Sequence, residues 1–194
     1  MATSLYRTTL RQDVRNGLPE ISSQLDSIRT YQFEVKFEGV PLAGSQTKKD
    51  LTLAAKQVDA VSYGVEPITV HRVNDVVYYP GKPQFEPVTI TFDNLMLKRT
   101  SRALWEWFKT IYDPMTGDLT KFSPPGGSGN TTFKAAKMTV MELDNTRTPR
   151  AAMEFYGVYP QSVSFSEKNY SQGEFSTIAV SFRYDYLDYF NYGI

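Results

Sequence analysis

The stretch TIAVSFRYDY, residues 177–186, decides the fold class of this chain. Large apolar side chains stand at every second position from Ile178 to Tyr186, and small or polar side chains stand between them. A strand with one buried face has this period of two, because successive side chains point to opposite faces of a sheet. We therefore predict a strand over Glu174–Tyr186, with a short strand over Val163–Ser166 before it.

The same alternation recurs in YQFEVKFE (31–38) and in VTITF (88–92). Further strands are predicted over 51–61, 133–143 and 152–159, the first of them on a weaker pattern. Phe, Trp and Tyr together make up 14% of the chain, and aromatic side chains favour strands. The chain is therefore predicted to be mainly β, an antiparallel β-barrel or sandwich with one α-helix packed outside.

Residues 66–83 are predicted to form a long β-hairpin. Two β-rich runs, Ile68–Val73 and Val76–Tyr79, are separated by Asn74-Asp75, and a two-residue turn of this kind joins antiparallel strands. Prolines stand at both ends of the hairpin, so we expect it to project from the body.

One helix is predicted, from Thr100 to Tyr112, and Asp113-Pro114 ends it. Its predicted apolar stripe, which should pack against the outside of a sheet, consists of Leu104, Trp105, Phe108 and Ile111.

Three segments lack a strand or helix pattern. Residues 1–30 are expected to form an extended N-terminal arm, residues 39–50 a solvated loop and residues 113–132 a flexible loop rich in Pro and Gly. The whole chain, residues 1–194, is predicted to be a single domain. Its parts are the arm (1–30), the first strands with hairpin and helix (31–112), the flexible loop (113–132) and the closing strands (133–194).

Composition argues against enzymatic chemistry. Lys plus Arg and Asp plus Glu number 21 each, and this zero net charge argues against a dedicated nucleic-acid binder. The chain has no cysteine and one histidine, so thiolate and multi-histidine metal sites are excluded. We predict no catalytic residues, no metal site, no cofactor and no enzymatic activity. No apolar run approaches the roughly 20 residues of a membrane-spanning helix, so no membrane segment is expected.

Small hydroxyl side chains occupy the polar faces of several predicted strands. They suit a water-filled lumen, although an ordinary exposed sheet face would have the same composition. The candidate lumen residues are Thr89, Thr91, Ser164 and Ser181.

The order of these segments resembles the tail tube proteins of contractile-tailed bacteriophages of the T-even type. The resemblance begins at FEVKFEGV (33–40) and continues through the hairpin region (53–94), the helix motif LWEWF (104–108) and TIAVSFRYDYLDY (177–189). The step Gly157-Val158-Tyr159-Pro160 is its most recognisable local feature. The similarity covers about residues 31–190, while the arm, the loop 41–50 and the insertion 113–132 depart from the family.

The resemblance implies a structural virion protein of the phage tail, made in the host cytoplasm. Members of that family form stacked hexameric rings whose sheets join into an inner tube for genome delivery. The expected partners are further copies of the chain, the sheath, the baseplate or initiator and the terminator, while DNA transits the lumen without sequence-specific binding. The hairpin would contact the next ring through Arg72, Asn74, Asp75 and Lys82.

Three other functions remain open on the sequence. A tail terminator or tube initiator, or the tube of a bacterial contractile injection system, would share the fold. A carbohydrate- or cell-binding β-module would instead be monomeric.

Overall fold

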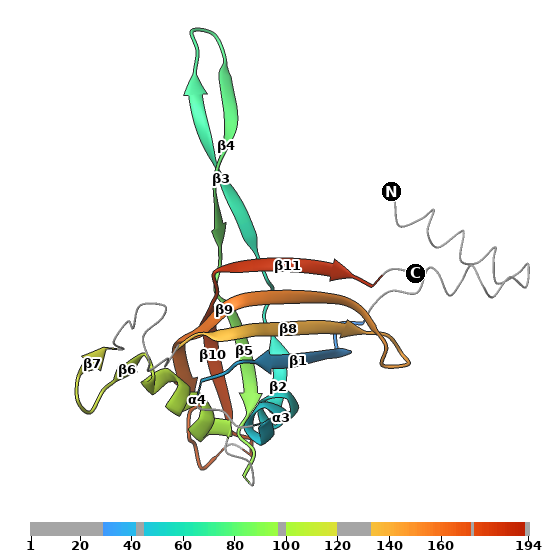
Figure 1. Ribbon diagram of the computed structural model, residues 1–194, viewed down its shortest axis with the longest axis vertical. Coiled ribbons are helices and arrows are strands. Elements are labelled where there is room, and N and C mark those ends of the chain that lie inside the picture. The colour runs from blue at the N-terminus through green and yellow to red at the C-terminus, as the bar shows by residue number, and fades with distance from the viewer. Residues whose placement is uncertain (1–28, 42–44, 97–99, 120–132, 172, 193–194) are drawn as a thin grey trace, which may run out of the picture.

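The computed structural model describes residues 29–41, 45–96, 100–119, 133–171 and 173–192. The described chain is mainly antiparallel β-structure, as predicted, with two helices (Figure 1). In chain order its elements are β1 (Phe33–Glu38), α3 (Ser45–Ala54), β2 (Ala55–Val58), β3 (Tyr63–His71), β4 (Val76–Phe85), β5 (Val88–Asp93), α4 (Thr100–Lys109), β6 (Tyr112–Asp113), β7 (Asp118–Leu119), β8 (Ala135–Leu143), β9 (Pro149–Phe165), β10 (Thr177–Arg183) and β11 (Tyr186–Asn191).

Strand β9, 17 residues long, joins two sheet portions into one body. Its first part pairs with β8 and β11, and β8 pairs in turn with β1; we call these strands the front sheet. Its second part pairs with β10, followed by β5 and β2; we call these the back sheet. Figure 1 shows the front strands lying across the view and β5 running down behind them. The described strands form a sandwich and not a closed barrel.

The core lies between the two sheets. Phe37 of the front sheet lies 6.2 Å from Phe92 and 5.8 Å from Phe182 of the back sheet, measured between ring centroids. Val180 and Phe182 are fully buried, as the alternation of residues 177–186 requires. The predicted strand over 174–186 ends earlier, however, and a turn at Tyr184-Asp185 separates β10 from β11.

Gly157 marks the point where β9 passes from one sheet to the other. Its φ is +67°, and a Cβ there would overlap the carboxylate of Asp185. Asp185 is held in this position because its N–H donates to the carbonyl of Tyr156 at 2.9 Å and because Lys134 Nζ lies 2.7 Å from Oδ1. The Gly157–Pro160 step therefore needs glycine for a close approach of side chain to backbone.

Helix α4 confirms the predicted helix, although it ends at Lys109 and Tyr112 begins strand β6. The stripe of the helix that packs against the core also differs from the predicted one. The buried residues are Thr100, Leu104 and Trp107 at spacings i, i+4 and i+7, whereas Trp105 is exposed. Trp107 stands edge-on to Phe37 and its Nε1 donates to the carbonyl of Phe133 at 2.8 Å. The prediction that Trp105 packs in the core is therefore wrong, because its neighbour on the opposite helix face provides the anchor. Phe108 and Ile111 are only half-buried.

The predicted loop 39–50 and the predicted strand 51–61 are also corrected. Helix α3 covers 45–54, and only 55–58 form a strand. Leu51 and Ala54 stand three residues apart and are buried, while Leu53 between them is 71% exposed. One face of a helix recurs at this spacing, so packing against the core explains the weak period-two pattern seen in the sequence.

The hairpin β3–β4 projects away from the body, as predicted (Figure 1), and is longer than residues 66–83. Pro67, Pro80 and Pro83 lie inside the strands, which is tolerated because both strands are edges of a two-stranded ribbon. The register shifts between Val65 and Pro67, and a Cβ on Gly81 would overlap the carbonyl oxygen of Glu66.

The other predicted irregular segments are described only in part. β6 and β7 form a small two-stranded ribbon in the predicted loop 113–132, and residues 120–132 lie outside the described residues. The predicted arm also lies outside them, except for its last two residues. Among the described helices, none has the length and hydropathy of a membrane-spanning segment.

Candidate assembly surfaces

The outward face of the back sheet brings the predicted lumen residues together. Ser181 of β10 stands opposite Thr89 of β5 and opposite Ser162 of β9. Ala179, on the same face, stands opposite Thr91 and Ser164. The intervening residues Ile90 and Val180 are fully buried on the other face. The result is a continuous surface of hydroxyl and methyl groups across three strands, which we call the hydroxyl face.

Charged residues stand only at the margin of the hydroxyl face in the described sheet. Asp93, at the end of β5, forms an ion pair with Lys56 of β2 at 3.5 Å. The centre of the face therefore has no fixed charge.

The outward face of the front sheet has a different chemistry. Lys137 of β8 lies 2.9 Å from Glu154 of β9, and the hydroxyl of Tyr156 donates to the same carboxylate at 2.5 Å. The Tyr156 hydroxyl and then Lys137 lower the pKa of Glu154 below its ordinary value. Glu34 and Lys36 of β1 form a further ion pair at 3.5 Å. This face is charged and ion-paired, so the sandwich presents two unlike surfaces.

Both sheets have open edges within the described chain. In the back sheet, β2 pairs only with β5, and residues 159–165 of β9 pair only with β10. In the front sheet, β1 pairs only with β8, and β11 only with β9. An open edge presents unpaired N–H and C=O groups that can pair with another chain.

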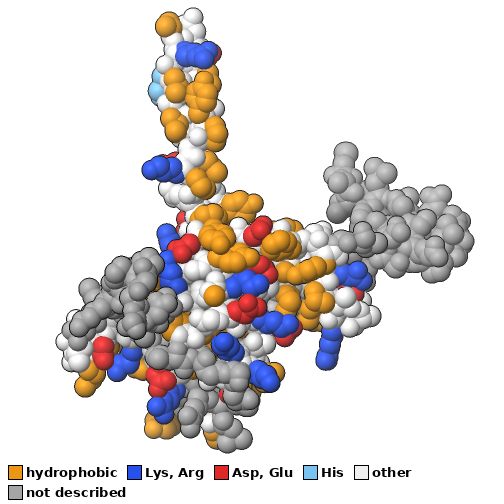
Figure 2. Space-filling view, viewed as in Figure 1, with side chains coloured by type: hydrophobic (Ala, Val, Ile, Leu, Met, Phe, Trp, Pro, Cys, Tyr) orange, Lys and Arg blue, Asp and Glu red, His pale blue; other side chains and the backbone are white. Residues whose placement is uncertain are grey.

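The hairpin exposes apolar side chains along its length (Figure 2). Ile68 stands opposite Tyr79, and Val70 opposite Val77, so one face of the distal hairpin is wholly apolar. The other face mixes polar and apolar pairs, Thr69 with Tyr78 and His71 with Val76. We call the first one the apolar hairpin face.

The predicted hairpin contact residues are not all in one place. Arg72, Asn74 and Asp75 lie at the tip, where the N–H of Arg72 donates to the carbonyl of Asp75 at 2.8 Å. Lys82 lies near the other end, beyond the close approach of Gly81 to the Glu66 carbonyl. Sequence reasoning missed the apolar hairpin face, although Ile68, Val70, Val77 and Tyr79 signal it by their register.

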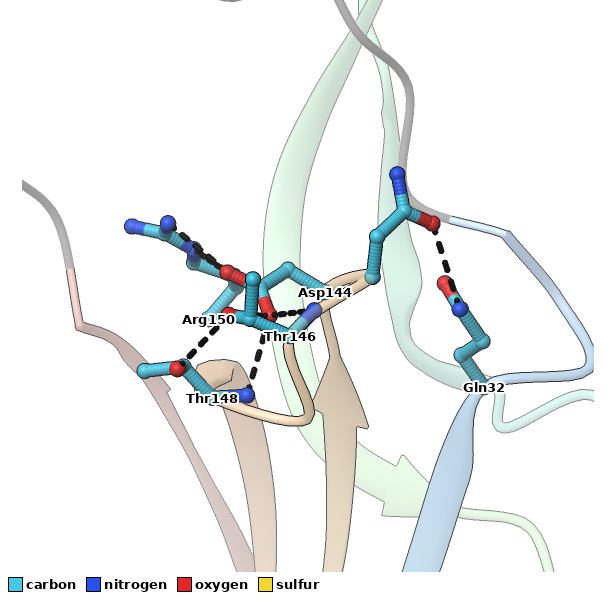
Figure 3. A network of polar contacts seen from close by, with 6 residues as sticks. Gln32, Asp144, Thr146, Thr148 and Arg150 are labelled. Atoms are coloured by element: carbon cyan, nitrogen blue, oxygen red, sulfur yellow. Dashed lines mark hydrogen bonds and ion pairs between the residues drawn. The ribbon is translucent and has the colours of Figure 1, made fainter.

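A polar network rigidifies the turn between β8 and β9 (Figure 3). Oδ1 of Asp144 accepts hydrogen bonds from the Thr146 hydroxyl at 2.6 Å, the Thr146 N–H at 2.7 Å and the Thr148 N–H at 2.9 Å. Its Oδ2 lies 2.8 Å from Arg150. Hydrogen bonds from these donors hold the pKa of Asp144 well below its ordinary value, and the bond from the Thr146 hydroxyl has the largest effect.

No metal centre assembles in the portion of the chain that the structure describes, since no three His, Asp or Glu side chains come together there. His71, the one histidine, is exposed on the hairpin. The candidate functional surfaces of the described chain are therefore the faces and the open edges of its sheets.

No family model and no curated protein matches the sequence. Solved structures do match the fold. A chain of the PVC sheath–tube complex, from an extracellular contractile injection system in the extended state, matches with a TM-score of 0.64 and 14% identity over 88% of this chain and 97% of that chain. A chain of the anti-feeding prophage cap, the tube-terminating cap, matches with a TM-score of 0.63 and 13% identity over 86% and 92%.

A chain of the six-fold symmetrised anti-feeding prophage baseplate matches with a TM-score of 0.62 and 8% identity over 86% of this chain and 97% of that one. Because the sequence identities are 14% or lower, these matches show a similarity of fold. The chain thus has the fold of proteins from contractile injection systems, as the sequence resemblance led us to expect.

Proposed function

From this shared fold we propose that the chain is a structural subunit of the inner tube of a contractile phage tail. Copies form hexameric rings, the rings stack, and the bore is the conduit for genome delivery. The observation that carries the proposal is the hydroxyl face, an uncharged polar surface on a sheet that is open at both edges.

The hydroxyl face is the proposed lining of the bore. Passing DNA is a polyanion, and tight binding to it would need Lys and Arg side chains that neutralise phosphates. The centre of the face offers Thr89, Thr91, Ser164 and Ser181, whose hydroxyl groups can hydrogen-bond to water and carry no fixed charge. DNA therefore transits without sequence-specific binding, and the charged front sheet faces outward to solvent or the sheath.

Ring closure uses the open edges of the back sheet. The edge of β2 in one copy pairs with residues 159–165 of β9 in the next, so that the sheet continues around the ring. Closing the back sheet in this way removes both of its exposed edges. Such a head-to-tail contact closes into a ring when the rotation between copies returns to its start.

The hairpin is the proposed contact with the adjacent ring, through Arg72, Asn74 and Asp75 at its tip and Lys82 nearer the body. The sheath, the baseplate or initiator and the terminator are the other proposed partners. The role is structural and non-enzymatic, in a virion assembled from protein made in the host cytoplasm.

Two related roles are the second candidate. The structural matches include chains from a tube-terminating cap and from a baseplate, so a terminator or initiator ring has the same support from the fold. The tube of a bacterial contractile injection system is supported by the sheath–tube match in the same way.

Negative-stain electron microscopy of the purified chain tests these alternatives. We expect tubes with a central stain-filled pore and six-fold end views. Single rings that do not stack would favour the terminator or initiator. A protein that stays monomeric at high concentration would contradict the proposal and favour a monomeric carbohydrate- or cell-binding module.

A further inference from the structure

The end of the back sheet that lies farthest from the hairpin exposes large apolar side chains. β5 begins beside the hairpin base at Val88 and ends at Asp93, which stands opposite Thr177. The far end is therefore formed by the residues after Asp93 and by the loop from β9 to β10, seen at the bottom of Figure 1. Its exposed apolar residues, which we call the far-end cluster, are Met96, Trp105, Phe165, Tyr170 and Phe175.

The loop that carries part of this cluster is held in shape by hydrogen bonds. The N–H of Thr177 donates to Ser166 Oγ at 3.1 Å, the N–H of Asn94 donates to the carbonyl of Ser176 at 3.0 Å, and Lys168 Nζ donates to Ser176 Oγ. These contacts leave an open pocket between residues 166–170 and 174–177, with Tyr170 and Phe175 among its walls. The side chains of Tyr170 and Phe175 are both almost wholly exposed to solvent.

Trp105 extends this surface onto helix α4. Its ring centroid lies 6.3 Å from that of Phe165 and 5.9 Å from that of Phe108. Exposed apolar groups gathered at one end of a folded chain mark an interaction site.

The apolar hairpin face is the matching surface at the opposite end. Ile68, Val70 and Tyr79 are each between 41% and 56% exposed. The full length of β5 separates the hairpin base from the far-end cluster, so a hairpin that projects away from the body cannot reach the cluster of its own chain. Two complementary surfaces at opposite ends of one chain make a head-to-tail contact between copies that repeats without closing.

We propose that the hairpin of one copy docks into the far-end pocket of a copy in the next ring. This inference rests on the proposed function and names the receptor of the hairpin. The apolar hairpin face packs on Tyr170 and Phe175, and Arg72 at the tip faces the carboxylates of Glu167 and Glu174 beside the pocket. The far-end loop has one cation, Lys168, which is already engaged with Ser176.

Cysteine cross-linking tests the contact directly, because the natural chain has no cysteine. The test variant combines Val73→Cys at the hairpin tip with Phe175→Cys in the pocket; both positions are at least 90% exposed, so neither change disturbs the core. Under mild oxidation we expect a ladder of covalent multimers beyond the dimer, lost on reduction. A second pair, Tyr79→Cys with Tyr170→Cys, repeats the test with an exposed residue of the apolar hairpin face.

The matched controls are each single variant and the pair Val73→Cys with Lys36→Cys, whose second site is exposed on the front sheet. None of them should form multimers beyond the dimer. Dimers from Val73→Cys alone, at the level of the double variant, would show that hairpins pair with each other and would overturn the proposal.

Electron microscopy of the same samples separates this inference from the proposed function. Tubes without a ladder from either pair would overturn the docking site and leave the tube function standing. A ladder without tubes would support the docking site and contradict the tube. Neither ladder nor tubes would overturn both.

Discussion

At the residue scale, two tryptophans of α4 have opposite environments although a single residue separates them. Trp107 is 1% exposed and hydrogen-bonded, whereas Trp105 is 37% exposed. Truncating a buried aromatic side chain costs about 3–5 kcal/mol, and a surface substitution changes stability by about 0.5 kcal/mol or less. We expect Trp107→Ala to lose about 3–5 kcal/mol of unfolding free energy in urea titrations, and Trp105→Ala much less. Equal losses would contradict the observed orientation of the helix.

Gly157 permits the switch of β9 between sheets. We expect Gly157→Ala to destabilise the fold by several kcal/mol, because a positive φ costs about 1–2 kcal/mol for an L-residue and the new methyl group would overlap Asp185. Gly64→Ala is the matched control, since no atom other than those of Gly64 and its two chain neighbours lies within 4 Å of the added Cβ. Thermal unfolding of both variants measures the difference. In an Asp185→Ala background, Gly157→Ala should cause a smaller loss of stability. An unchanged loss would mean that the backbone conformation of residue 157 alone accounts for it.

At the element scale, the turn between β8 and β9 predicts a dependence of stability on pH. The pKa of Asp144 is lower in the folded chain than in the unfolded chain because three N–H or O–H donors and Arg150 favour its charged form. The contribution of the Asp144 carboxylate to the free energy of unfolding is therefore complete above the ordinary carboxyl pKa of about 4. That contribution is lost progressively as the pH falls below this value.

Asp144→Asn tests this turn. The variant should unfold at a lower urea concentration than the wild type at pH 7, and the difference should narrow as the pH falls below about 4. Asp75→Asn, which removes the same charge from the exposed hairpin tip, is the control and should show no such difference. If the difference in unfolding midpoint between Asp144→Asn and the wild type stayed constant down to pH 2, the Asp144 carboxylate would not be the source of that difference.

At the scale of the whole molecule, the proposed tube separates the two outward faces into an inside and an outside. We expect Ser164→Cys on the hydroxyl face and Lys36→Cys on the front sheet to react alike with maleimides in free subunits, since both positions are exposed. In assembled tubes Ser164→Cys should react with a small maleimide and resist one that carries a long polyethylene glycol chain. Lys36→Cys should accept both. Equal labelling of the two sites in tubes would place the hydroxyl face outside.

The features that depend on neighbouring residues along the chain could be predicted from the sequence. The alternation of residues 177–186 predicts a strand and its buried face, and Ile178, Val180 and Phe182 are indeed buried. The same period places Thr89, Thr91 and Ser181 on the opposite faces of their strands, which the register then aligns. Strand geometry imposes this outcome locally, because side chains alternate whatever the strand packs against.

Other features of the fold depended on how the helices and strands pack against one another. Residues 51–54 have a pattern too short to distinguish a helix from a strand, and contact with the core decided for a helix. Trp105 and Trp107 are equally apolar, and the positions of Phe37, Phe182 and the Phe133 carbonyl select Trp107 as the anchor. Ile68 and Val70 alternate with polar residues as buried strand residues do, yet no second layer covers the hairpin in the described chain, so they remain exposed. An apolar pattern determines which face of an element avoids water, and only the tertiary structure determines whether anything in the same chain covers that face.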